Sequence, residues 1–252
     1  MNKLNVFSIP VSTAPYADFI TEITDAAVAK RSEYVCLANV HMLVEAYRNK
    51  EFATVVRNAN SVTPDGKPLC WALRVLYGIK QDRVAGVDLT QDLLQAASQK
   101  SIPVYFYGGT QDVLWKAEEF FKTQYPALQL AGTYSPPFRA LTPAEEEGVA
   151  QRINNSGAGL VFVVLGCPKQ ERWMASMQGK INAVCVGIGA ALPVMMGIYK
   201  RAPKWVRNAG LEWAFRLTQE PKRLFKRYLV SNSVFLYLLL KACFRKVFYS
   251  MA

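Results

Sequence analysis

Two apolar runs that each end in a glycine turn are the feature that most constrains the fold of this chain. Residues 160–165 read LVFVVL and lead into Gly166 and Pro168, and residues 183–186 lead into Gly187-Ile188-Gly189. A short run of this kind that stops at glycine or proline is typical of a strand. A helix-length segment joins the two runs, which predicts neighbouring parallel strands. Ligands of such sheets bind outside the carboxyl ends of the strands.

Strand and helix patterns alternate along most of the chain. We predict strands at residues 4–11, 34–38, 61–63 and 103–107, and helices at residues 16–30, 42–58, 69–77 and from 111 to 124. No repeat or low-complexity linker interrupts this order. The pattern predicts an α/β fold, Rossmann-like, with a mainly parallel sheet and helices on both faces. We place the catalytic core at residues 1–199 and a basic helical appendage at 200–252.

The positive charge of the chain is concentrated in this appendage. The net charge is +11, and residues 200–246 hold twelve lysines and arginines against two acids, Glu212 and Glu220. The rest of the chain is nearly neutral. A local excess of this size favours an anionic ligand or an anionic surface.

Other features exclude several classes of protein. The five cysteines form no CxxC pair, and the N-terminus lacks a secretion signal, so we expect reduced cysteines in a cytoplasmic protein. His41 is the only histidine, which excludes a multi-histidine metal site. The late apolar run at residues 233–240 is shorter than the roughly 20 residues that span a bilayer. We therefore expect a protein that lies on a membrane and does not cross it.

Several ordered motifs resemble those of the WecG/TagA/CpsF glycosyltransferases, glycosyltransferase family 26. They lie in most parts of the chain: TPDG at 63–66, RVAGVDL at 83–89, YFYGGT at 105–110, GCPKQE at 166–171, GIGAA at 187–191, KRAPKW at 200–205, GLEW at 210–213 and RLTQEPKRLFKRYL at 216–229. The resemblance implies an inverting, metal-independent enzyme without a cofactor. Its donor would be a UDP-sugar and its acceptor a saccharide on a polyprenyl diphosphate, used in surface-polysaccharide or cell-wall polymer biosynthesis.

Asp65 is the candidate catalytic residue. It follows a predicted strand in a tight turn, where an aspartate serves either as a turn or capping residue or as a general base at the edge of the sheet. In the family that it resembles, the aspartate of the TPDG-type motif is the proposed base. The resemblance therefore favours deprotonation of an acceptor hydroxyl by Asp65.

The candidate substrate-binding residues lie at the ends of other predicted strands. The resemblance implies contacts from Asn39, Arg83 and Gln170, and we add His41 because it is close to Asn39. Leu37 stands where several relatives have a threonine, and Leu192-Pro193 replaces a Phe-Asp pair, so those polar roles do not transfer. Either Asp88 or Thr90 is interpreted as the cap of a helix that runs through Ser98, and Glu171 is interpreted as structural. Glycines can bring backbone N–H groups close to a phosphate, and the glycines assigned to the site are Gly86, Gly108, Gly109, Gly187 and Gly189.

Three arginines of the appendage are the candidate diphosphate ligands. Arg216, Arg223 and Arg227 share a helical face if the helix is continuous, and the sequence leaves open whether Pro221 divides it into two. Because the chain has no DxD-type carboxylate pair for a metal, cationic side chains would have to neutralise the departing diphosphate. The alternative interpretation of these three arginines is a solvated basic helix face without a ligand.

Two other classes of function compete with the enzyme. A basic, aromatic tail also suits a nucleic-acid-binding α/β protein, although no recognised nucleic-acid motif accompanies it. A dehydrogenase is a weaker candidate, because neither glycine turn is a full GxGxxG. We favour the glycosyltransferase. We expect it to be peripheral on the inner face of the cell membrane, with an anionic membrane surface as a partner, and we expect it not to bind nucleic acid. Homo-oligomer formation, the sugars and the linkage stay open.

Overall fold

The computed structural model describes residues 1–250, with only the backbone given for residues 245–250. Arg245 and Lys246, which were counted in the basic segment, thus lie outside the described side chains. The fold is α/β, with a six-stranded parallel sheet in the order β4-β3-β8-β7-β5-β6. Its strands are β3 (Glu33–Ala38), β4 (Ser61–Pro64), β5 (Val104–Gly108), β6 (Leu130–Tyr134), β7 (Leu160–Val164) and β8 (Val184–Gly187). β7 and β8 are paired and parallel, as their glycine-terminated runs predicted.

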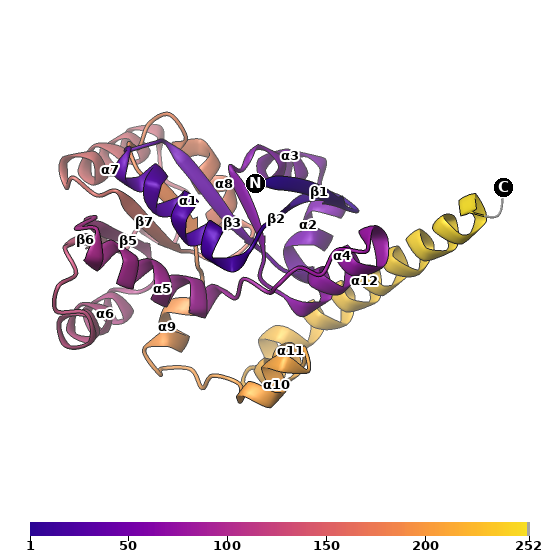
Figure 1. The fold of residues 1–252 in the computed structure, drawn as a ribbon. Coiled ribbons are helices and arrows are strands. Elements are labelled where there is room, and N and C mark those ends of the chain that lie inside the picture. The colour runs from indigo at the N-terminus through magenta and orange to yellow at the C-terminus, as the bar shows by residue number, and fades with distance from the viewer. Residues whose placement is uncertain (251–252) are drawn as a thin grey trace.

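Helices cover both faces of the sheet (Figure 1), which buries both. One face carries α1 (Tyr16–Val28), α5 (Gly86–Gln99), α6 (Gln111–Gln124) and α9 (Ala191–Met195). The other carries α2 (Val40–Arg48), α3 (Lys50–Asn58), α4 (Lys67–Tyr77), α7 (Pro143–Asn155), α8 (Lys169–Met177) and part of α12 (Pro221–Ser250).

Alternating side chains of β5 show how the two cores are built. Phe106 stacks on Phe121 and Phe162, with ring centroids 4.7 and 5.1 Å apart. Its neighbour Tyr107 points to the opposite face and stacks on Trp173 at 3.9 Å. This is the period of two that a pleated strand imposes.

The C-terminal segment adds two short helices, α10 (Lys204–Asn208) and α11 (Glu212–Gln219), before the long helix α12. Helix α12 runs beside α2 and α4, and its end extends past the rest of the fold (Figure 1). Its inner side chains Phe235 and Leu238 are buried in the same core cluster as α2 and α4. Among the helices that the structure describes, none combines the length and the apolar character that a membrane span requires.

Several predicted elements need correction. Residues 4–11 are not one strand but a hairpin of β1 (Asn2–Val6) and β2 (Ile9–Thr13), because Phe7 adopts φ 55° and turns the chain. The helix predicted at 42–58 is divided into α2 and α3, since Asn49 leaves the helical conformation and caps α3.

Neither Asp88 nor Thr90 caps α5, because that helix already begins at Gly86. The Thr90 hydroxyl instead donates to the Gly86 carbonyl oxygen at 2.7 Å. The structure answers the question that the sequence left open at Pro221: the segment is divided, since α11 ends at Gln219 and Pro221 begins α12.

Candidate active site

A cavity of about 790 Å³ lies at the carboxyl ends of the sheet strands. Segments that follow β3, β4, β5, β7 and β8 form its inner wall, and the chain from Tyr199 to Asn232 contributes the opposite side. This is the edge where ligands of open α/β sheets bind. The volume falls within the range of small-molecule sites. The site is therefore built jointly by the sheet and the C-terminal helices.

Asp65 lies in this cavity directly after β4. Its backbone N–H donates to the carbonyl oxygen of Ala38, and its Oδ1 accepts a 2.8 Å hydrogen bond from the Gly86 N–H. Within the described residues, nothing donates to Oδ2. Burial, and next the nearby Glu212 carboxylate, raise the pKa of Asp65 to about 6, against the lowering effects of the Gly86 N–H, Arg83 and Arg216. A carboxylate held by one oxygen, with a raised pKa, suits a general base.

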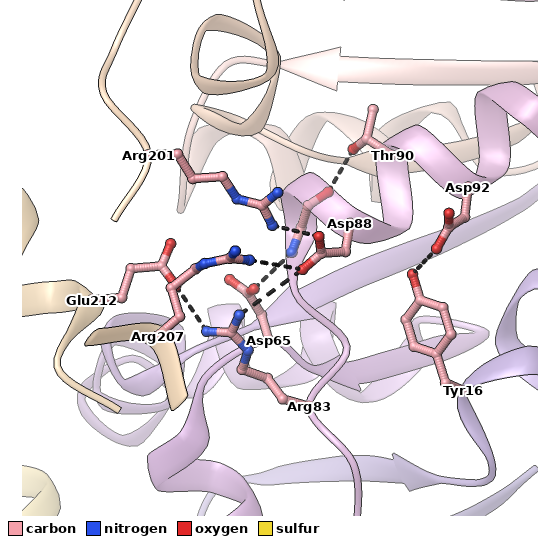
Figure 2. Close-up of polar contacts among 10 residues, drawn as sticks. Tyr16, Asp65, Arg83, Asp88, Thr90, Asp92, Arg201, Arg207 and Glu212 are labelled. Atoms are coloured by element: carbon pink, nitrogen blue, oxygen red, sulfur yellow. Dashed lines mark hydrogen bonds and ion pairs between the residues drawn. The ribbon is translucent and has the colours of Figure 1, made fainter. Parts of the chain in front are cut away.

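Arg83 connects this edge to the C-terminal segment (Figure 2). Its Nη1 lies 2.8 Å from Glu212 Oε2, and its Nη2 lies 4.0 Å from Asp88 Oδ2. Arg83 lines the cavity, as predicted for a substrate-binding residue, but its charge is already engaged by Glu212.

Asp88 is the meeting point of three arginines. In addition to Arg83, Arg201 donates to its Oδ1, and Arg207 Nη1 lies 3.8 Å from Oδ2 (Figure 2). Two of these arginines come from the C-terminal segment and one from the core. Asp88 therefore connects the core and the C-terminal segment at the N-terminus of α5.

Gln170 acts as a clamp between two glycine turns. Its Oε1 accepts from the Gly166 N–H at 3.0 Å, and its Nε2 donates to the Gly187 carbonyl oxygen at 3.1 Å and to Glu171 Oε1 at 2.8 Å. The side chain lines the cavity but is buried, and these bonds use both ends of its amide. The structure thus gives Gln170 a positioning role for the loops that it joins.

The predicted glycines divide into two groups. Gly86, Gly109, Gly187 and Gly189 line the cavity, whereas Gly108 does not. A Cβ on Gly108 would lie 2.8 Å from the Val164 carbonyl oxygen, and its φ is +100°. That glycine allows β5 and β7 to approach closely. At Gly187 a Cβ would lie 2.9 Å from Gln170 Nε2, so a side chain there would displace the clamp.

Asn39 and His41 both line the cavity at the end of β3. Asn39 caps α2 by accepting from the Met42 N–H at 3.2 Å. Within the described residues its amide nitrogen makes no hydrogen bond. Burial, and next the charge of Arg227, lower the pKa of His41 to about 4, so the imidazole is neutral at neutral pH.

All three predicted diphosphate arginines line the cavity, although they come from two helices. Arg223 pairs with Glu220, with Nε 2.6 Å from Oε2. Among the residues that the structure describes, Arg216 and Arg227 have no acidic partner within ion-pair distance. These two guanidinium groups are thus available for an anion.

Glu212, Asp88, Arg201 and Arg207 were not predicted as site residues. A signal for Glu212 was present, because it is one of only two acids in a strongly basic segment, and both of them line the cavity. In the described part of the chain, no group of three or more His, Cys, Asp or Glu is arranged to hold a metal ion.

The chain is similar to known glycosyltransferases. The model of a family described as "Glycosyl transferase WecG/TagA/CpsF family" matches residues 4–248. Among curated proteins, the chain is 32% identical over 194 residues to the N-acetylglucosaminyldiphosphoundecaprenol N-acetyl-beta-D-mannosaminyltransferase of Bacillus spizizenii (strain ATCC 23059 / NRRL B-14472 / W23). The aligned part covers 77% of this chain and 74% of that relative. The family match therefore extends over the sheet, the cavity and the C-terminal helices.

Proposed function

Since this chain belongs to the WecG/TagA/CpsF family of glycosyltransferases, we propose that it transfers a sugar from a UDP-sugar to a saccharide on a polyprenyl diphosphate. The observation that carries the proposal is that Asp65, Arg216 and Arg227 line one cavity, and that the two arginines have no acidic partner among the described residues. A base for the acceptor and cations for the leaving diphosphate are the two requirements of such a transfer. Family membership favours this enzyme over the nucleic-acid-binding alternative.

In the proposed reaction Asp65 Oδ2 takes the proton of the acceptor hydroxyl. The hydroxyl oxygen then attacks the anomeric carbon in line with the departing diphosphate oxygen. The new C–O bond forms as the sugar–diphosphate bond breaks, so the configuration at the anomeric carbon inverts. The Gly86 N–H holds Oδ1 and thereby directs the other carboxylate oxygen. General-base assistance of this kind contributes about 10²–10⁴ in rate.

The departing UDP would be stabilised by Arg216 and Arg227, with Arg223 beside them. A planar guanidinium engages two phosphate oxygens at once, and its charge offsets the charge that develops on the leaving group. We propose that these arginines replace a divalent metal. Excess EDTA should therefore leave turnover unchanged, and loss of activity restored by Mg²⁺ or Mn²⁺ would contradict this part of the proposal.

We also propose that α12 docks on the inner face of the cell membrane. Its outward side presents an exposed apolar stripe with helical spacing, formed by Phe225, Leu229, Leu236, Leu240 and Phe244. Lys222, Lys226 and Lys241 flank it and are exposed. Such a helix suits the interface of an anionic leaflet, where each cationic side chain contributes about 1 kcal/mol. This location would bring the cavity to a lipid-linked acceptor.

The direct test is a panel of UDP-sugars and short-chain lipid diphosphate acceptors incubated with the purified protein. The relative is named for the transfer of N-acetylmannosamine to N-acetylglucosaminyldiphosphoundecaprenol. The first pair to try is therefore an N-acetylmannosamine donor with an N-acetylglucosaminyl diphospholipid acceptor. We expect one donor–acceptor pair to give a disaccharide product with inverted configuration, measured by mass spectrometry and NMR. A product with retained configuration would contradict the single in-line displacement.

A further inference from the structure

Glu212 brings a carboxylate from the C-terminal segment to the side of the proposed base. It is the first residue of α11, and it lies 129 positions after Arg83, with which it shares a 2.8 Å ion pair (Figure 2). Both side chains are partly buried. A pair of this length in a sheltered site is stronger than an exposed surface pair.

The ion pair with Glu212 determines which acidic side chain Arg83 contacts. Three acidic side chains lie near its guanidinium: Glu212, Asp88 and Asp65. Asp88 is already occupied by Arg201 and Arg207, and its oxygen lies 4.0 Å from Arg83. Glu212 is therefore the principal partner of Arg83, and the guanidinium is not within ion-pair distance of Asp65 in the described structure.

We propose that Glu212 is a positioning residue that holds Arg83 off Asp65, so that the packed C-terminal segment makes Asp65 a stronger base. This inference rests on the proposed function, in which Asp65 is the general base. It adds a role for the C-terminal segment besides binding the diphosphate. The C-terminal segment thus both supplies cations for the leaving group and strengthens the proton acceptor.

The electrostatics of the site support this role. After burial, the negative charge of Glu212 is the next cause that raises the pKa of Asp65, whereas the Gly86 N–H, Arg83 and Arg216 lower it. Among the described residues, the other charged side chains that line the cavity are Lys67, Lys169, Lys200, Arg201, Glu220, Arg223 and Arg227, while His41 on α2 is neutral at neutral pH. Removal of Glu212 takes away a negative charge and frees a positive one. Both changes make Asp65 a weaker base.

The experiment measures the single-turnover rate against pH for the full chain and for Glu212→Gln, with saturating UDP-sugar and acceptor. We expect the acidic limb of the variant to move to lower pH and its plateau rate to fall severalfold, because a weaker base transfers the proton less readily. Glu147→Gln is the control, since it removes one carboxylate from the exposed face of α7. It should leave both limb and plateau unchanged.

The double variant Arg83→Gln/Glu212→Gln removes both charges and leaves neither partner buried alone. Its acidic limb should return toward that of the unmodified protein, whereas Arg83→Gln alone should move the limb to higher pH. A limb that stays in place in Glu212→Gln, with reduced activity, would overturn the inference and leave Glu212 a structural residue. Full turnover by Asp65→Asn would instead refute the proposed base itself, which separates the two failures.

Discussion

At Asp65, burial and a neighbouring carboxylate act in the same direction on the pKa, which rises to about 6. We expect Asp65→Asn to fold and to lose at least about tenfold in turnover, and up to 10⁴-fold, because the amide cannot accept the acceptor proton. Its Oδ1 still accepts from the Gly86 N–H, so the local geometry is kept. Initial rates of Asp65→Asn and Asp65→Ala measure the effect. Equal rates for the variants and the unmodified protein, with chemistry limiting, would exclude Asp65 as the base.

The ionised carboxylate of Asp65 should also lower the free energy of unfolding. Its folded-state pKa is raised above the unfolded value of 3.8, so stability is lost as the pH rises through the window from about 4 to about 6. Above that window Asp65→Asn should be more stable than the unmodified protein, by about 3 kcal/mol at most. The advantage should disappear below about pH 4, where both states of Asp65 are protonated. Urea unfolding of both proteins at the two extremes of pH measures the difference.

At the scale of single helices, the side of α11 and α12 that faces the cavity has a different role from the outward side of α12. Arg216 on α11 and Arg227 on α12 face the cavity without acidic partners among the described residues. We expect Arg216→Gln and Arg227→Gln each to lower kcat/KM for the donor by about 10- to 100-fold, the loss of one or two charge-assisted hydrogen bonds. Lys222→Gln, which changes an exposed cation outside the cavity, is the matched control. If the three variants have equal effects, net charge alone accounts for the result.

The outward side of α12 can be tested separately from its inward side. Ser substitution of Leu229, Leu236 and Leu240, each about half exposed or more, should lower binding to anionic liposomes at least about tenfold. Turnover with a water-soluble acceptor should not change. Phe235→Ala, on the buried side, should instead cost about 3–5 kcal/mol of folding stability.

Co-sedimentation with liposomes and thermal unfolding distinguish these two outcomes. Trp115→Ser on α6 is the control for membrane binding, because Trp115 is as exposed as the stripe but lies elsewhere. Equal loss of binding in this control would show that α12 is not the docking face.

At the scale of the whole molecule, the C-terminal segment is part of the site and also of the core. Truncation after Gly197 removes Glu212 and the three arginines proposed to bind the diphosphate, and it uncovers the cluster that Phe235 and Leu238 help to bury. We expect the truncated chain to lose at least about tenfold in turnover with a water-soluble acceptor, and to unfold at a lower temperature. Full turnover by the truncated chain would reduce the segment to an anchor.

Local pattern was enough to predict much of this protein. Buried parallel strands appear as short apolar runs, and each stops at a glycine, a proline or a polar turn, so the sheet and its ligand-binding edge follow from nearest-neighbour chemistry. Asp65, Asn39, His41 and the turns of Gly109, Gly187 and Gly189 were placed correctly at that edge for this reason. The ring of Pro221 raised the question of a break in the C-terminal helix, and the structure decided it.

The partners of charged side chains were decided only by the tertiary structure. Arg83 meets Glu212 across 129 residues, and Asp88 gathers Arg201 and Arg207, because α5 and the C-terminal segment are packed against the same edge of the sheet. The orientation of α12 was decided in the same way, since its apolar residues lie on both sides and only packing against α2 and α4 selects the buried one. Periodicity and turn chemistry act over a few residues, whereas an ion pair or a packed face depends on where distant segments meet.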